Sequence, residues 1–273
     1  MNVIVGFEDF KNLIKDNEKI TKEIWKENYY SKYKNVFDAM LKYLYFMNLN
    51  DFLKFIENIN FNELLKLSEE AIKNNLIDKV LKLIEKGMDI LDFNEDFNIY
   101  FLVGLGHVDG TSLPDDKPFI YFGLERLNSL NLNFLVPHEF NHLVRLFKMK
   151  DKINRLKVID YIIFEGLATY FSLYFNNLEI NKENEAKSLI IPIDALEKLY
   201  ENEDKIKYEI FNLIQSDMNN QIMFEYFTFD GEKRLKQGYF IGLKIIENVV
   251  NKGYNIQHLT ILNSEEILTI YYK

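Results

Sequence analysis

The sequence HEFNH at residues 138–142 is the feature that most constrains this chain. On a helix, side chains four positions apart lie about 40° apart around the axis and about 6 Å apart along it. His138 and His142 can therefore reach one tetrahedral metal ion. Glu139 is rotated by about 100° from His138, so we expect it to hydrogen-bond to water on that ion rather than bind the ion itself. That is the position of a general base.

The alternative is that both histidines are ordinary exposed residues on an amphipathic helix. Helical spacing argues against this alternative, because the histidines share one broad stripe with the apolar residues Leu135, Leu146 and Met149. We therefore interpret His138 and His142 as metal ligands.

The composition limits the kinds of site and partner that the chain can have. Cysteine is absent, which excludes disulfides, cysteine nucleophiles and thiolate zinc sites, so nitrogen and oxygen must hold any metal. A net charge of -9 gives no excess of Lys and Arg for nucleic acid or an anionic membrane, and we expect neither partner. The apolar run at residues 3–7 is too short for a signal peptide, so we expect a cytoplasmic protein. We also expect no membrane span, since Glu165 interrupts the most apolar stretch, residues 161–175.

The pattern of apolar residues changes along the chain. Residues 8–91 have apolar residues at helical spacing among Lys, Glu and Asn, which predicts an all-α N-terminal region. Residues 99–103 and 119–122 are rich in aromatic and β-branched residues, and the glycines and prolines between them predict two strands joined by a long turn. A helical period returns after residue 133. We expect a domain boundary near residue 95.

A catalytic zinc site needs three protein ligands, and Glu165 is the candidate for the third. It lies in the middle of a predicted helix, residues 158–171, that is apolar around most of its circumference and should be buried. No Lys or Arg occurs from residue 161 to 169, so no cation one turn away can neutralise this carboxylate. A metal ion is the partner that also explains the histidines. The alternative is a buried Glu that is protonated or hydrogen-bonded to a distant side chain.

The sequence HEFNH followed by Glu165-Gly166-Leu167-Ala168 resembles the gluzincin class of zinc metallopeptidases. It resembles more closely the bacterial predicted Zn-dependent proteases, whose pattern is HExxH and then EGLA, over roughly residues 97–270. This resemblance implies an α+β, mostly helical, zincin-like fold. From this resemblance together with the change of pattern near residue 95, we expect a helical N-terminal region at residues 1–95 and a zincin-like catalytic domain at residues 96–273, with a small sheet before the metal helix.

The same resemblance implies roles for individual residues. His138, His142 and Glu165 would bind Zn²⁺, and Glu139 would be the base. The thermolysin-type pattern has an Asp four residues after the ligand Glu, but Thr169 stands at that position here. The group that orients a ligand histidine must therefore come from elsewhere, or be weaker.

The expected activity is zinc-dependent hydrolysis of a peptide bond in a peptide or protein substrate. Glu139 would take a proton from the water on zinc, and that water would attack the carbonyl. The oxyanion needs a further donor, for which Tyr239 is the candidate, because Gly238 and Gly242 flank it at a predicted helix start. Gluzincins often supply a Tyr or His from this half of the chain. The alternative is that Tyr239 is an ordinary packed tyrosine.

Two other functions are compatible with these motifs. A non-enzymatic binding or regulatory module could use the zincin fold with a structural metal, although such a site has no need of Glu139. A hydrolase of a non-peptide amide would use the same water and base. Arg145 could pair with a substrate carboxylate, although a surface or structural ion pair is the more ordinary expectation. The sequence does not indicate the oligomeric state.

Overall fold

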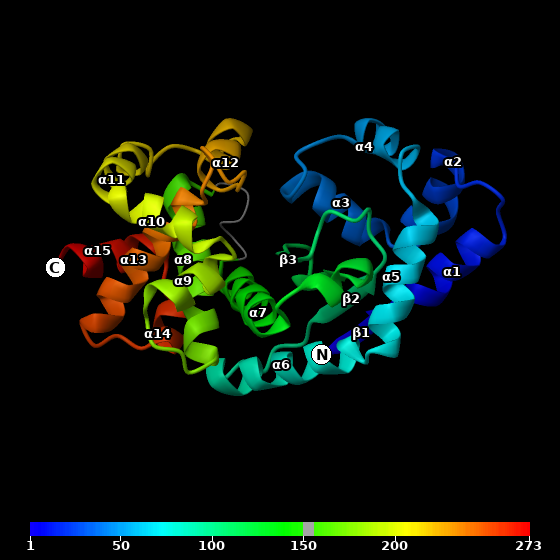
Figure 1. The fold of residues 1–273 in the computed structure, drawn as a ribbon. Helices are drawn as coiled ribbons and strands as arrows, with labels where there is room; N and C mark the ends of the chain where they lie inside the picture. The colour runs from blue at the N-terminus through cyan, green and yellow to red at the C-terminus, as the bar shows by residue number, and fades with distance from the viewer. Residues whose placement is uncertain (150–155) are drawn as a thin grey trace. The chain divides into compact units, whose positions relative to one another are not determined.

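The computed structural model describes residues 1–149 and 156–273 (Figure 1). These residues are mostly helical and contain one four-stranded sheet, which confirms the predicted α+β, mostly helical class. The chain forms two compact units. The first consists of Met1–Glu85 and Asn94–Leu132, and the second consists of Lys86–Phe93 and Asn133–Lys273.

The sheet lies in the first unit and has the strand order β1-β2-β4-β3. Its strands are β1 (Asn2–Val5), β2 (Asn98–Leu102), β3 (Gly110–Leu113) and β4 (Phe119–Gly123). β1, β2 and β4 run parallel, with Ile4 opposite Tyr100 and Tyr100 opposite Tyr121, and β3 runs antiparallel to β4. β2 and β4 are the two strands that the sequence predicts.

β1 and β3 are strands that the sequence does not predict, and β1 lies before residues 8–91, which contain only helices and turns as expected. Each has four residues and lies at an edge of the sheet. Neither segment alternates apolar and polar residues, so neither shows the usual signal of a strand. The partner of β1 is also distant in the sequence, so only tertiary contacts reveal this strand.

The helices of the first unit enclose a core of aromatic side chains. Trp25 is fully buried and packs edge to face on Phe37, with ring centroids 5.0 Å apart. Such pairs add to the free energy gained by burying the rings. The helical elements are α1 (Phe7–Lys15), α2 (Lys22–Trp25), the π-helix Lys26–Tyr30, α3 (Lys34–Tyr43), α4 (Leu49–Ile56), α5 (Phe61–Lys73) and the 3₁₀-helix Leu124–Ser129.

α6 (Leu76–Leu91) begins in the first unit and ends in the second. The other helices of the second unit are α7 (Leu132–Lys148), α8 (Val158–Phe175), α9 (Lys182–Leu189), α10 (Ile193–Glu201), α11 (Glu203–Phe211), α12 (Asn220–Tyr226), α13 (Gln237–Asn251), α14 (Ile256–Ile261) and α15 (Ser264–Tyr272). α8 is apolar on all sides and packs chiefly on α13. It is therefore the core helix of this unit.

Among the described helices, α8 alone is long and apolar enough to cross a membrane by length and composition. In this structure 72% of it is buried inside the protein. The core helix of a soluble protein has the same properties, so this finding is weak support for a membrane span.

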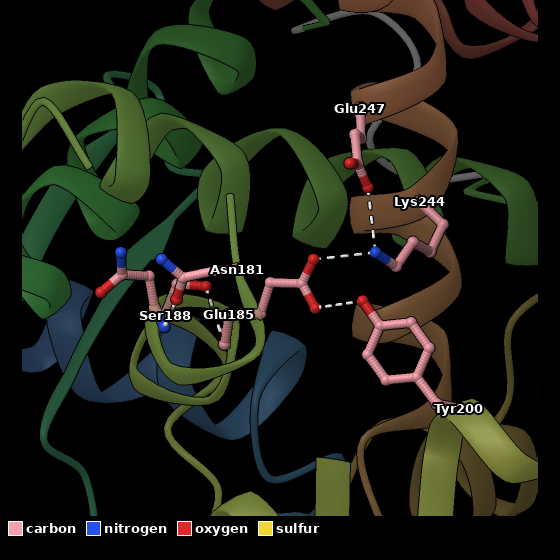
Figure 2. A network of polar contacts seen from close by, with 7 residues as sticks. Asn181, Glu185, Ser188, Tyr200, Lys244 and Glu247 are labelled. Atoms are coloured by element: carbon pink, nitrogen blue, oxygen red, sulfur yellow. Dashed lines mark hydrogen bonds and ion pairs between the residues drawn. The ribbon is translucent and has the colours of Figure 1, made fainter. Parts of the chain in front are cut away.

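A buried polar network joins α13 to α9 and α10 (Figure 2). Glu185 of α9 is 1% exposed, and its Oε1 lies 2.8 Å from Lys244 Nζ of α13. Its Oε2 accepts a hydrogen bond from the Tyr200 hydroxyl of α10. Lys244 Nζ also lies 2.9 Å from Glu247 Oε2. Both oxygens of the buried carboxylate are therefore satisfied.

The expected boundary near residue 95 lies close to Asn94, where the chain returns from the second unit to the first. The sheet belongs to the same unit as the N-terminal helices. The division into a helical N-terminal region, residues 1–95, and a catalytic domain, residues 96–273, stays a prediction.

Candidate metal centre

α7 presents its two histidines to one point, as the spacing predicts. His138 Nε2 and His142 Nε2 lie 3.0 Å apart. The two rings are nearly perpendicular, with an angle of 88° between their planes. The side chains of His138 and His142 are 12% and 11% exposed, so both are largely withdrawn from solvent.

Pro137 lies inside α7, directly before the first histidine. Proline has no N–H to donate, so the carbonyl oxygen of Asn133, four residues earlier, loses its helical partner. Asn176, the C-cap residue of α8, replaces that partner, since its Nδ2 donates to Asn133 O at 2.7 Å. Ser172 Oγ of α8 donates to the next carbonyl, Phe134 O, at 3.0 Å. α8 thus supports the start of the helix that carries the histidines.

Glu165 of α8 completes a triangle with the two histidines. Its Oε2 lies 3.2 Å from His138 Nε2 and 3.2 Å from His142 Nε2. Among the described residues, these three form the group that could hold a metal ion. Ligand atoms of a tetrahedral zinc site lie about 3.3 to 3.5 Å apart, given metal–ligand distances of about 2.0 to 2.2 Å. Small outward shifts would therefore bring these three atoms to coordination distance.

The electrostatics of this triangle keep Glu165 ionised. Burial raises the pKa of Glu165, but the nearby charges and hydrogen bonds of His142 and His138 outweigh burial and hold it below its usual value. Burial lowers the pKa of His142, but the charge of Glu165, its hydrogen bond with His142 and the charge of Glu139 together outweigh burial and raise that pKa above its usual value. An anionic carboxylate beside two imidazoles is a donor set that suits Zn²⁺.

Glu139 is 7% exposed and is not part of the group of converging ligand atoms. Its negative charge helps to raise the pKa of His142 and that of Tyr239, so it lies close to both residues. Glu139 therefore lies outside the group that could hold a metal ion, and its role as the base stays a prediction.

Tyr239 of α13 is brought to the same place. Its ring stacks on His138, with centroids 6.1 Å apart and planes 12° apart. Burial raises the pKa of Tyr239 well above its usual value, and the charges of Glu165 and Glu139 and a hydrogen bond with Glu165 raise it further. The hydroxyl therefore stays protonated and can act as a hydrogen-bond donor.

Arg145 differs from the sequence expectation. It is 1% exposed, and its Nη1 donates to two carbonyl oxygens at the end of α14, Thr260 O and Leu262 O, each at 3.1 Å. Sequence reasoning missed Thr260 because its separation from Arg145 along the chain leaves no local signal.

The comparisons with known proteins agree with this geometry. Residues 68–180 match the family described as predicted Zn-dependent protease (DUF2268). This match confirms the family resemblance for the part of the chain that holds His138, His142 and Glu165. It ends at residue 180, so the resemblance over the later residues, which include Tyr239, stays a prediction. No curated protein and no solved structure matches the chain. The zincin-like fold therefore stays a prediction.

Proposed function

We propose that this protein is a zinc-dependent peptidase of the gluzincin type, acting on a peptide or protein substrate. The observation that carries this proposal is the convergence of three ligand atoms, within 4.8 Å of one another, from His138, His142 and Glu165. These residues supply two nitrogens and one carboxylate, which is a catalytic zinc donor set that leaves a fourth position for water.

The fit to zinc is also supported by the state of the donors. All three side chains face one point, and Glu165 is held anionic by the two histidines. A metal cation at that point can take over the attraction that the histidines exert on this carboxylate. The ligands come from two helices whose relative position is fixed by Ser172 and Asn176. Ligands supported in this way need little rearrangement when the ion binds.

When bound, Zn²⁺ polarises the scissile carbonyl and makes water a stronger acid. Glu139 then accepts the proton of the attacking water and delivers it to the leaving amine. Tyr239 donates a hydrogen bond to the oxygen on which negative charge develops. Its raised pKa keeps the proton on its hydroxyl for this purpose.

A non-enzymatic metal module is the main competing function. Its metal would be structural, and Glu139 would then have no task. The position of Glu139 beside the ligand group favours catalysis, because a general base must lie within reach of the water on the metal. A hydrolase of a non-peptide amide would share every step above, and the choice of substrate in the assay separates it from a peptidase.

Metal analysis combined with a peptide-library assay tests the proposal. We expect near-stoichiometric zinc in the wild type and in Glu139→Gln, weakened zinc binding in His138→Ala and Glu165→Ala, and peptide cleavage by the wild type alone. His258→Ala is the matched control, because this histidine is exposed and lies outside the ligand group. Undiminished zinc in Glu165→Ala would reject the third ligand, and full activity in Glu139→Gln would reject the base.

A further inference from the structure

The buried Arg145 joins the metal helix α7 to the end of α14. It lies one turn after His142, and its Nη1 donates to Thr260 O and Leu262 O. The last carbonyl groups of a helix have no backbone partners, and the C-terminal end of its dipole is negative. Arg145 therefore caps α14 with its positive charge.

A second hydrogen bond joins the same two helices. Asn141 Nδ2 donates to Thr260 Oγ1 at 3.0 Å, and Asn141 and Thr260 are both buried. Asn141 stands between the two ligand histidines in the sequence, and Arg145 follows it by one helical turn on the same face. α7 is thus attached to α14 by two neighbouring side chains.

The guanidinium of Arg145 also packs on a ring that contacts a metal ligand. Its Cζ lies 4.9 Å from the centroid of the Phe164 ring. The centroid of the Phe164 ring lies in turn 5.8 Å from that of His142. Phe164 directly precedes Glu165 in α8. Phe164 therefore contacts both Arg145 and the ring of His142, and it is the residue before Glu165 in the chain.

His142 needs support of this kind. A metal-binding histidine normally donates its second ring N–H to a carboxylate, a carbonyl or water, which sets the orientation of the ring. Among the residues that the structure describes, His142 Nδ1 is buried and has no hydrogen-bond partner. Thr169 Oγ1, at the position expected to orient a ligand, has none either. Packing against Phe164 restrains the ring from a side other than its contacts with His138 and Glu165 through Nε2.

We propose that Arg145 is a positioning residue for the metal centre: anchored on α14, it holds Phe164 against His142 and so orients this ligand. This inference rests on the proposed metal site. The proposal predicts the direction in which Zn²⁺ affinity changes when Arg145 is replaced. Loss of a nearby positive charge would by itself strengthen the binding of a cation. Loss of a positioning residue weakens that binding instead.

The test compares the zinc affinity of folded variants. We expect Arg145→Met, which keeps most of the apolar stem, and Phe164→Leu each to weaken Zn²⁺ binding about tenfold or more, as outer-shell changes do. Affinity is measured by competition with a chromophoric chelator. The absorption spectrum of bound Co²⁺, which depends on coordination geometry, should change in both variants.

Lys86→Met is the matched control. Lys86 Nζ donates to Phe175 O at 2.7 Å and lies 4.1 Å from the Phe175 ring centroid, so it also caps a helix and packs on an aromatic ring. Neither Lys86 nor Phe175 belongs to the ligand group. We expect this variant to lose stability while its Zn²⁺ affinity and Co²⁺ spectrum stay those of the wild type.

Unchanged or tighter Zn²⁺ binding by folded Arg145→Met would overturn the proposal. If Arg145→Met does not fold, Phe164→Leu is the deciding variant. Wild-type Zn²⁺ affinity and an unchanged Co²⁺ spectrum in Phe164→Leu would then overturn the proposal. An equal loss of Zn²⁺ affinity in Lys86→Met would also overturn it, since general destabilisation would then explain the effect. Absence of Zn²⁺ binding in the wild type is a separate result, because it would reject the metal site itself.

Discussion

Gly166 of α8 and Gly242 of α13 cross so closely that a Cβ atom on Gly166 would lie 2.3 Å from the carbonyl carbon of Gly242. Glu165 adjoins the first glycine, and Tyr239 lies one turn before the second. The separation of these two helices therefore decides how closely Tyr239 approaches the ligand carboxylate. A larger residue at either position would move both groups.

Gly242→Ala should reduce stability and disturb the metal centre. Its Cβ would lie 2.2 Å from Ile162 O, and backbone atoms of α8 cannot rotate away. We expect a loss of about 1 to 3 kcal/mol from overpacking. This loss exceeds the gain of up to about 1 kcal/mol in helix propensity. Urea unfolding measures the change.

Gly238→Ala is the control on the same helix. Its Cβ would meet the ring of Phe227 at 2.5 Å, which is a side chain that can shift. The destabilisation should therefore be smaller than in Gly242→Ala. Equal stability of Gly242→Ala and the wild type would contradict the close crossing.

Tyr239→Phe should separate two roles of the hydroxyl. As a donor to the developing oxyanion, the hydroxyl should contribute about 100- to 1000-fold to kcat, while zinc content stays that of the wild type. As a neighbour of Glu165, whose charge adds to burial in raising the pKa of Tyr239, it should contribute to zinc affinity instead. Zinc titration and kcat measured on one preparation show which effect dominates. A variant with wild-type values of both would leave Tyr239 as a packed tyrosine.

Lys244→Met should destabilise the second unit strongly, because it leaves the buried Glu185 without its cation (Figure 2). We expect a loss of about 3 kcal/mol, which Glu185→Leu combined with Lys244→Met should largely restore. The exposed pair Lys187 and Glu183 on α9 provides the control. Lys187→Met should cost only about 0.3 to 0.5 kcal/mol. Similar losses in the two single variants would contradict the assigned burial.

The stability difference between the wild type and the double variant Glu185→Leu with Lys244→Met, which has no unpaired buried carboxylate, should not vary between pH 6 and about pH 9. Burial lowers the pKa of Lys244, but its hydrogen bonds with Glu185, Tyr200 and Glu247 outweigh burial and raise that pKa above its usual value. A raised pKa in the folded state gives stability that is complete below the unfolded value of about 10.4. It is lost only as the pH rises through the folded value. Thermal unfolding of both proteins at each pH checks this, and a difference that shrinks by pH 9 would contradict the raised pKa.

The candidate site could be predicted largely from local rules. The helical period places His138 and His142 on one face of α7, and the absence of a neighbouring cation singles out Glu165. Local rules could not predict that Arg145 would cap α14, because a buried arginine and a surface arginine look alike in the sequence. They also could not predict β1, whose four residues form a strand only by pairing with β2.

The sequence by itself determined the geometry within α7, because 3.6 residues per turn relate His138, Glu139 and His142 wherever the helix lies. The tertiary structure alone decided that Glu165 and Tyr239 meet those histidines at one point. Their helices are separate segments, and only the packing of α8 on α7 and α13 sets the distances between them. Side-chain volume and buried hydrogen bonds control such packing, and neither has a period that can be read along a chain.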